Sequence, residues 1–332
     1  MKLKNQHILI TGGAGFIGSH LSLTLAKNNH VTIYDNFSSS VLSLSHLRNL
    51  SDLSNLKVMK GDILDQKSLF RAMENIDIVF HLAVACVRMS LNNPIQVHEV
   101  NATGTLNTLY TAKKHKVKHF IYVSSSEVYG TAKRPLMSET HPTDPTTVYG
   151  MSKLIGEQYT RYFHAHEGLP TTIVRPFNTY GPRSHFDGVY GEVIPRFVIR
   201  SLNNKQPIIF GDGSQSRDFT YVDDTVRGLI LSAESDELLG DTINIARGKE
   251  VTIKELAREI NLIVTLPFDP IYKPARPNDV LRHAADISKA KKLLKFAPEI
   301  SIKEGLSRYI QYLKSTYPNT TKLLKLIPEK NW

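Results

Sequence analysis

Residues 7–28 read HILITGGAGFIGSHLSLTLAKN, and this stretch decides the fold. The apolar run HILIT predicts a β-strand, and SHLSLTLAKN has apolar residues at helical spacing. Between them, Gly12 and Gly13 permit a tight turn, and Gly15 lets the backbone approach a pyrophosphate. Gly18 lets the helix pack close to the strand, and the positive helix N-terminus faces the phosphates. The stretch therefore predicts the first strand, turn and helix of a dinucleotide-binding fold.

An acidic residue, Asp35, ends the second predicted strand, 17 residues after Gly18. Its carboxylate would hydrogen-bond the adenosine ribose hydroxyls and repel a 2′-phosphate, which favours NAD over NADP. Asp62 and Ile63, in KGDILD after the third strand, would flank the adenine, although Asp62 could equally cap a helix. A structural glycine turn beside an incidental carboxylate is the alternative, and the order of strand, turn, helix and acid argues against it.

Short β-rich runs alternate with helix-patterned stretches through the first half of the chain. Gly/Pro-rich pieces separate shorter helical segments after about Thr179, and apolar character returns at TVRGLILSA and TINIA. We expect an α/β protein with a Rossmann-type doubly wound parallel sheet and a smaller C-terminal substrate-binding lobe. The expected NAD-binding domain is 1–178 with a returning segment at about 222–246, and the expected lobe is 179–221 with 247–332.

Composition excludes several classes of protein. The chain has 332 residues, of which 41% are hydrophobic, without an apolar run near the ~20 residues of a membrane helix. Its net charge of +10 is dispersed, which argues against nucleic-acid binding. Cys86 is the only cysteine, and His164 and His166 point apart on a helix, so no metal site is expected. We expect a soluble cytoplasmic protein without membrane insertion.

Tyr149 and Lys153 lie four residues apart at the start of a predicted helix and project from one face. An ammonium group and an oxidised nicotinamide would stabilise a tyrosine phenolate, and Lys153 can also hold a cofactor ribose. In isolation this pair is more often ordinary helix-surface chemistry, but the upstream dinucleotide signature favours a functional role. Ser125 ends the fifth strand at the edge where parallel sheets bind ligands, although a serine-rich helix cap is the alternative.

Nine motifs follow one another in a familiar order: GGAGFIG, YDN, GDI, HLA, SSSEVYG, YGMSK, RPFNTYGPR, RDFTYVDD and RPND. In their order and spacing, the chain resembles the extended short-chain dehydrogenase/reductase family of sugar-nucleotide epimerases, dehydratases and decarboxylases over almost its whole length. The resemblance implies that Ser125 is the catalytic hydroxyl, Tyr149 the base and Lys153 its partner, with NAD retained through turnover. It also implies cofactor contacts from the motif residues Phe16, Ile17, Asn36, Leu82 and Ala83.

The resemblance further implies a nucleotide-sugar site. Asn178 would contact the diphosphate, and Arg217 and Arg276 would clamp its phosphates, a task that suits bidentate guanidinium groups. For Arg217 alone, a surface ion pair is the alternative. Asp279 would bind the nucleotide ribose, and Ser126 would lie beside the sugar. An apolar wall for the base would come from Phe210, Val193 and Ile194, although each is more often plain core. The family's usual base is uracil, so we expect a UDP-hexose or UDP-N-acetylhexosamine.

The three reactions of this family share a 4-keto sugar intermediate and then diverge. An epimerase returns hydride to the other face of the sugar, whereas elimination needs an additional acid and base. Glu127 stands where the resembling dehydratases and decarboxylases carry a glutamate, but Ser126 lacks the aspartate typical of 4,6-dehydratases. Because the loop 184–192 and the C-terminal half resemble epimerases, we expect a C4 epimerase. NDP-sugar dehydration by 4,6- or 5,6-elimination and UDP-glucuronate decarboxylation through Glu127 are the alternatives. A non-enzymatic NAD-binding redox sensor or scaffold is disfavoured by the retained reacting residues.

Two further expectations concern the sugar pocket and assembly. His283 lies near the position where resembling epimerases limit the sugar's C2 substituent, and a histidine there would admit an N-acetyl group; an exposed histidine is the alternative.

Helices around 92–115 and 150–167 would form a four-helix homodimer interface, as is usual in the family. The C-terminal KLLKLI either adds to an interface or caps the fold.

Overall fold

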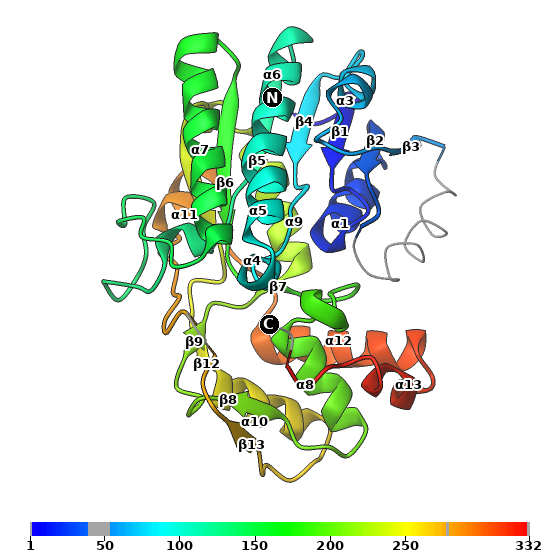
Figure 1. Ribbon diagram of the computed structural model, residues 1–332, viewed down its shortest axis with the longest axis vertical. Helices are drawn as coiled ribbons and strands as arrows, with labels where there is room; N and C mark the ends of the chain where they lie inside the picture. Colours follow the sequence, from blue (N-terminus) through cyan, green and yellow to red (C-terminus); the bar gives the residue numbers. More distant parts are fainter. Residues whose placement is uncertain (1, 39–53, 277–278, 331–332) are drawn as a thin grey trace.

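Seven parallel strands form the central sheet of the computed structural model, which describes residues 2–38, 54–276 and 279–330 (Figure 1). Within these residues the strand order is β11-β6-β5-β4-β1-β2-β3. The order reverses between β1 and β4, as in doubly wound dinucleotide-binding sheets, which confirms the predicted fold class. The strands are β1 (His7–Thr11), β2 (His30–Asp35), β3 (Leu56–Lys60), β4 (Ile78–His81), β5 (His119–Val123), β6 (Thr171–Pro176) and β11 (Thr242–Ile245).

Helices cover both faces of this sheet. In Figure 1, α5, α6 and α7 lie together in front of the strands, and α9 lies behind them, where it packs against α1. The helices around the sheet are α1 (Phe16–Leu25), α3 (Gln66–Ala72), α4 (Met89–Asn92), α5 (Pro94–His98), α6 (Gly104–Lys114), α7 (Val148–Glu167), α9 (Val222–Glu234) and α11 (Ser288–Leu294).

The helix expected around residues 92–115 is present, and the chain is helical without a gap from Pro94 to Lys114. Asn93 separates α4 from α5, and its side chain accepts a hydrogen bond of 3.3 Å from the Gln96 backbone N–H. Pro94 takes the first position of α5, where its missing N–H is tolerated. A π-helical turn, Glu99–Thr103, then leads into α6.

Alternate residues of the central strands pack into two separate cores. In β1, Ile8 and Ile10 belong to one cluster, whereas Leu9 belongs to the other, and all three are fully buried. In β5, Ile121 likewise faces the first cluster and Phe120 the second. Successive side chains of a strand point to opposite faces, so both faces of this sheet are covered.

The remaining helices and strands, most of them short, lie below the sheet in Figure 1. The Gly/Pro-rich segments after Thr179 connect them, and β11 then pairs with β6, so TINIA joins the central sheet. Among the described residues, no helix has both the length and the apolar composition that crossing a bilayer requires. These elements are β7 (Thr179–Tyr180), α8 (Val193–Leu202), β8 (Ile208–Phe210), β9 (Ser216–Arg217), β10 (Thr220–Tyr221), β12 (Val251–Thr252), α10 (Ile253–Ile263), β13 (Ile271–Lys273), α12 (Ile302–Thr316) and α13 (Thr320–Leu324).

Candidate active site

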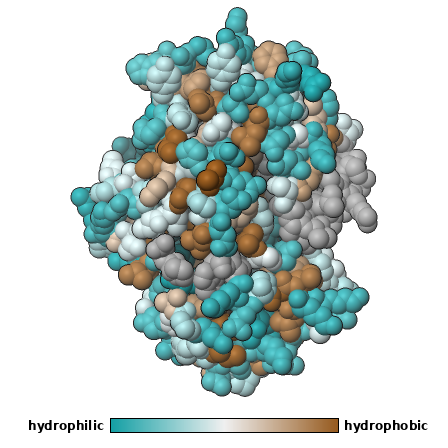
Figure 2. All heavy atoms as spheres, in the orientation of Figure 1, coloured by the Kyte–Doolittle hydropathy of each residue, from teal (hydrophilic) through white to brown (hydrophobic). Residues whose placement is uncertain are grey.

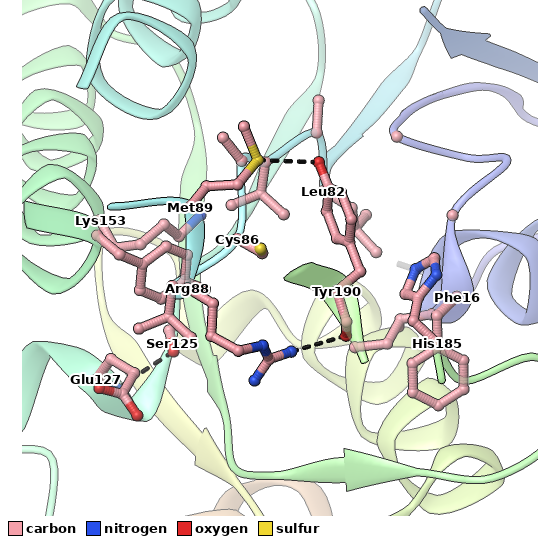
Figure 3. Close-up of a pocket in the computed structure, with 18 of the residues that line it drawn as sticks. Phe16, Leu82, Cys86, Arg88, Met89, Ser125, Glu127, Lys153, His185 and Tyr190 are labelled. Carbon is pink, nitrogen blue, oxygen red and sulfur yellow. Dashed lines mark hydrogen bonds between the residues drawn. The ribbon is translucent and has the colours of Figure 1, made fainter. Parts of the chain in front are cut away.

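A cavity of about 780 Å³ lies at the carboxyl edge of the central sheet (Figure 3). Its walls come from the loops after β1, β2, β3, β4, β5 and β6 and from the start of α8. This is the edge at which doubly wound sheets bind their ligands. Almost all of the site residues expected from the sequence line this one cavity.

The glycine turn forms the floor of one end of the cavity. Gly12 has φ +68°, and a Cβ atom there would lie 2.7 Å from the backbone nitrogen of Ala83. A Cβ atom on Gly18 would lie 2.8 Å from Gly13 Cα. Helix α1 begins after Gly15 without a side-chain cap, so its first N–H groups stay available. The turn therefore has the shape and the donors that a dinucleotide pyrophosphate needs.

Polar residues gather at the far end of this turn. The Asp35 carboxylate accepts hydrogen bonds from the backbone N–H groups of Ala14, at 3.0 Å, and Phe37, at 2.9 Å. Burial raises the pKa of this carboxyl. The Asn36 side-chain amide donates to the Asp62 carboxylate at 2.8 Å, which brings the second and third strand ends together. The expected adenosine end of an NAD site is thus assembled from residues that the sequence identified.

Asp62 does not cap the helix that follows it. Asp65 caps α3 instead, accepting from the backbone N–H groups of Lys67 and Ser68. Asp62 remains at the cavity wall, where its other oxygen accepts from the Leu64 backbone N–H at 2.9 Å. Of the two interpretations of Asp62, the structure excludes the helix cap. Ile63 and the motif residues Phe16, Ile17, Leu82 and Ala83 line the same end of the cavity.

Ser125, Tyr149 and Lys153 all line the cavity. The Thr147 side chain caps α7 by accepting from the Gly150 N–H at 3.1 Å, which places Tyr149 in the first turn. Burial raises the pKa of Tyr149 well above its usual range, and the Ser125 hydroxyl opposes this rise. Burial lowers the pKa of Lys153 to about 7, an effect that the Glu157 carboxylate opposes. The end of β5 and the first turns of α7 thus place a hydroxyl, a phenol and an amine at the wall of one cavity.

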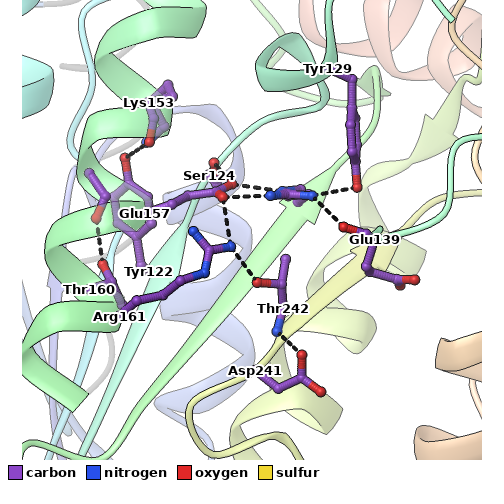
Figure 4. A network of polar contacts seen from close by, with 12 residues as sticks. Tyr122, Ser124, Tyr129, Glu139, Lys153, Glu157, Thr160, Arg161, Asp241 and Thr242 are labelled. Carbon is purple, nitrogen blue, oxygen red and sulfur yellow. Dashed lines mark hydrogen bonds and ion pairs between the residues drawn. The ribbon is translucent and has the colours of Figure 1, made fainter. Parts of the chain in front are cut away.

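A buried network of charged and polar side chains lies next to the reacting residues (Figure 4). The Glu157 carboxylate, one turn after Lys153, accepts from Arg175 Nε at 2.7 Å and from Arg175 Nη2 at 2.6 Å. It also accepts from the Ser124 hydroxyl at 2.7 Å and from Arg161 at 3.0 Å. Because Ser124 precedes Ser125, the network ties the end of β5 to α7 and β6 and fixes how the two reacting segments lie.

Glu127 lies in the same cavity, two residues after Ser125. Its backbone N–H donates to the Ser125 hydroxyl at 3.2 Å. Burial raises the pKa of its carboxyl, and the guanidinium groups of Arg217 and Arg88 oppose the rise. A carboxyl with a raised pKa beside the reacting residues is chemically able to act as an acid or a base.

The expected diphosphate and ribose ligands also reach the cavity. Arg217 forms an ion pair with Asp279 at 2.7 Å, and this pair lines the cavity rather than the outer surface. The Asn178 side-chain oxygen is buried and has no hydrogen-bond partner among the described residues. Val193 and Arg276 line the cavity as well. The motif residues 277 and 278, between Arg276 and Asp279, lie outside the described residues.

Phe210 lies outside the large cavity. It lines a neighbouring cavity of about 110 Å³, which shares Val193 and Arg276 with the first. The Arg276 guanidinium lies over the Phe210 ring, 5.1 Å from its centroid. An apolar wall is therefore present at this end, but an arginine covers its face.

The expectation for His283 is wrong. The side chain is fully buried and does not line the cavity. One ring nitrogen lies 2.9 Å from the carbonyl oxygen of Gly130, and the other lies 3.5 Å from the Ser126 hydroxyl. Burial lowers the pKa of His283 to about 3. His283 is neither a limit on the sugar pocket nor an exposed residue, because it packs behind the loop that carries Ser126.

Sequence reasoning missed a second group of residues at the cavity wall. Arg88 follows β4, and its Nε and Nη2 atoms donate to the carbonyl oxygens of Val189, at 2.6 Å, and Tyr190, at 2.7 Å. The Tyr190 hydroxyl lies 3.2 Å from the sulfur of Met89. A signal was available, since Arg88 is the only Asp, Glu, Lys or Arg between positions 82 and 97. Cys86, His185 and Glu192 complete this group.

Comparisons with known proteins give matches that span most of the chain. The family described as GDP-mannose 4,6 dehydratase matches residues 9–309. A putative UDP-glucose 4-epimerase of Methanocaldococcus jannaschii is 35% identical over 311 residues, covering 93% of this chain and 98% of that protein. A UDP-N-acetyl-alpha-D-glucosaminuronate decarboxylase of Bacillus cytotoxicus is 37% identical over 327 residues, with the same coverage. The structure of UDP-glucuronic acid 4-epimerase from Bacillus cereus, in complex with UDP-glucuronic acid and NAD, has a TM-score of 0.88 at 34% identity, covering 94% of this chain and 100% of that chain.

Proposed function

Since the chain belongs to the GDP-mannose 4,6-dehydratase-type family of extended short-chain dehydrogenases/reductases, we propose that it is an NAD-dependent C4 epimerase of a UDP-linked six-carbon sugar. The observation that carries the proposal is that Ser125, Tyr149 and Lys153 line the same cavity as the glycine turn. The glycine turn expected to bind the cofactor and the reacting groups thus line one cavity.

The cofactor end of the cavity fits NAD. The glycine turn and the α1 N-terminus would hold the pyrophosphate, and Asp35 would bind the adenosine ribose hydroxyls. Asn36, Asp62 and Ile63 would flank the adenine. When bound, NAD accepts a hydride from sugar C4 and returns it. Lys153 would hold the second ribose while its ammonium group faces Tyr149.

The reacting residues of the chain manage the C4 hydroxyl proton. Tyr149 removes this proton as the sugar is oxidised and returns it when the sugar is reduced on the other face. Burial raises the pKa of Tyr149, so the phenolate forms only while positive charge lies beside it. Ser125 donates to the same sugar oxygen and so keeps it aligned. An epimerase needs no acid or base beyond Tyr149 and Ser125.

The opposite end of the cavity would bind the nucleotide part of the UDP-sugar. Arg217, Arg276 and Asn178 would bind the diphosphate, and the buried Asn178 oxygen without a partner supports a ligand there. Asp279 would bind the ribose, which requires rearrangement of its ion pair with Arg217. Val193 and Phe210 would contact the base. In this proposal residues 1–178 and about 222–246 bind NAD, and residues 179–221 and 247–332 bind the nucleotide sugar.

Glu127 supports a second candidate function, elimination or decarboxylation after C4 oxidation. Its carboxyl lies beside Ser125 and has a raised pKa. Glu127→Gln separates the candidates, because an epimerase keeps its turnover within about tenfold, whereas loss of a general acid or base costs about 10²–10⁴-fold. Tyr149→Phe is the matched control that stops either reaction at its first step.

A panel of UDP-sugars tests the proposal directly. Products are separated by chromatography and weighed by mass spectrometry. A product of unchanged mass and altered retention supports the epimerase. Loss of water identifies a dehydratase, and loss of carbon dioxide identifies a decarboxylase; either result overturns the proposal.

The same proposal includes a homodimer. Apolar side chains lie exposed on the face formed by α5, α6 and α7, which Figure 2 shows as brown groups on its upper half. Ile95, Tyr110, Met151 and Tyr162 are 72%, 53%, 48% and 50% exposed. Aromatic and aliphatic side chains gathered on one helical face are typical of protein–protein interfaces. Sedimentation of the protein and of an Ile95→Glu, Tyr110→Glu double variant tests this assembly; a monomeric wild-type protein would contradict it.

A further inference from the structure

Arg88 carries a positive charge into the middle of the cavity. Figure 3 shows its side chain extending between Ser125 and Glu127 on one side and Tyr190 and His185 on the other. Its charge contributes to the electrostatic environment of Tyr149 as well as of Glu127 and Glu192. Arg88 therefore lies in the part of the cavity that Ser125 and Glu127 also line.

The guanidinium group of Arg88 is oriented but retains unused donors. Two of its five N–H groups donate to the carbonyl oxygens of Val189 and Tyr190. These bonds fix the plane of the group, so little conformational freedom would be lost when a ligand binds. Among the residues that the structure describes, Arg88 has no ion pair with a carboxylate. Three N–H groups and a full positive charge remain for an incoming anion.

Buried carboxyls and further guanidinium groups surround Arg88. Glu192 and Glu127 are the nearby carboxyls, and burial raises the pKa of both, that of Glu192 to about 7. The neighbouring cations are Arg276 and Arg196, whose pKa values burial and their mutual repulsion with Arg88 lower. Arg88 thus shares the cavity with Arg276, and among the described residues neither Glu127 nor Glu192 forms an ion pair with it.

We propose that Arg88 binds a carboxylate carried by the sugar, so that the preferred substrates are UDP-linked acidic sugars. The inference rests on the proposed function, in which Arg217 and Arg276 already serve the diphosphate. A planar guanidinium with two adjacent donors matches the two oxygens of a carboxylate. The carboxylate of the sugar would form the ion pair that Arg88 lacks among the described residues.

Two kinds of acidic sugar share this chemistry. One carries the carboxylate at C6, as in UDP-glucuronate, and the other carries it on a 3-O-lactyl ether, as in UDP-N-acetylmuramate. Each has a neutral counterpart of the same ring, UDP-glucose and UDP-N-acetylglucosamine. These two matched pairs separate the effect of the carboxylate from that of the ring and the nucleotide.

The test measures equilibrium binding by titration calorimetry with Tyr149→Phe protein, which binds without turnover. We expect at least one acidic sugar to bind at least about tenfold more tightly than its neutral counterpart. Adding Arg88→Gln should abolish that preference and leave the Kd of the neutral sugar within about threefold. Adding Arg217→Gln instead should weaken both members of a pair equally, because both carry the diphosphate.

Three results would overturn the proposal. One is equal or tighter binding of the neutral sugars by the parent protein. Another is an Arg88→Gln protein that loses affinity for both members of a pair equally. The third is an Arg88→Gln protein that retains the preference for the acidic sugar. Affinity for UDP alone verifies that each variant still forms the nucleotide site. Because binding is measured without turnover, a different reaction type would refute the proposed function and leave this result standing.

Discussion

The ammonium group of Lys153 donates a hydrogen bond of 2.7 Å to the carbonyl oxygen of Val123, at the end of the strand that leads into Ser125. The same nitrogen lies 4.3 Å from the centre of the Tyr122 ring. Lys153 is only 2% exposed, so its charge is held by the strand end and by Glu157 rather than by water. This arrangement joins the cofactor side of the cavity to the reacting groups.

Burial of Lys153 makes the stability of the NAD-free protein depend on pH. Its pKa is about 7 in the folded protein, against about 10.4 in an unfolded chain, so the unfolded chain binds more protons between these values. The contribution of Lys153 to the free energy of unfolding therefore rises with pH in this window, by an amount on the order of 1–3 kcal/mol between pH 7 and 9. Urea unfolding of wild-type and Lys153→Met protein should give curves that diverge over this range. Parallel pH profiles would show that Lys153 keeps an ordinary pKa.

Two glycines of the first turn should respond differently to alanine. A Cβ atom on Gly18 meets the backbone of Gly12 and Gly13, so Gly18→Ala should lower the free energy of unfolding by about 1–3 kcal/mol or more. On Gly15 the nearest atom is 3.3 Å away, so Gly15→Ala should fold with little loss. The added methyl group should nevertheless obstruct the pyrophosphate and weaken NAD binding at least about tenfold. Unchanged NAD affinity in Gly15→Ala would place the pyrophosphate elsewhere.

Asp35 should control the choice between NAD and NADP. Asp35→Asn removes the negative charge that repels a 2′-phosphate, so the preference for NAD over NADP should fall at least about tenfold in fluorescence titrations. The carboxylate also accepts from the Ala14 and Phe37 N–H groups, and an amide can accept only with one of its ends. We expect a loss of about 1–3 kcal/mol in stability alongside the change in preference. A variant that still excludes NADP would contradict the assignment of Asp35.

Residues of the network behind Lys153 should differ strongly in how much they contribute to the free energy of unfolding. Glu157 is fully buried and receives two hydrogen bonds from Arg175, whose side chain is only 3% exposed. Glu157→Gln would leave that guanidinium without its countercharge and should lower the free energy of unfolding by about 3–5 kcal/mol. Arg161→Ala removes a partner that is 35% exposed and should cost less than about 1 kcal/mol. Equal losses in the two variants would show that the charge pair is not what stabilises this region.

The fold could be predicted because its signals are local. The glycine turn, the strand endings and the alternating apolar runs each report on a few neighbouring residues, and the parallel sheet follows from their alternation. Asp35, Asn36 and Asp62 could be placed together because carboxyl ends of parallel strands meet at one edge.

The errors concern residues whose position depends on contacts between distant segments. His283 is 153 residues from Gly130, and only the folded chain shows that it packs behind the cavity. Arg88 and Tyr190 are 102 residues apart, and neither flanking sequence indicates that they meet. Such pairs depend on how loops cross the end of the sheet, which local spacing does not encode.

The central claim, transient oxidation at sugar C4, is tested most directly with a UDP-sugar that carries deuterium at C4. The account predicts a C4 epimer that has the same mass as the labelled substrate and retains the deuterium at C4, as determined by NMR. Tyr149→Phe should leave the labelled substrate unchanged. A product that has lost the C4 label to solvent, or one that has lost water or carbon dioxide, would contradict the account.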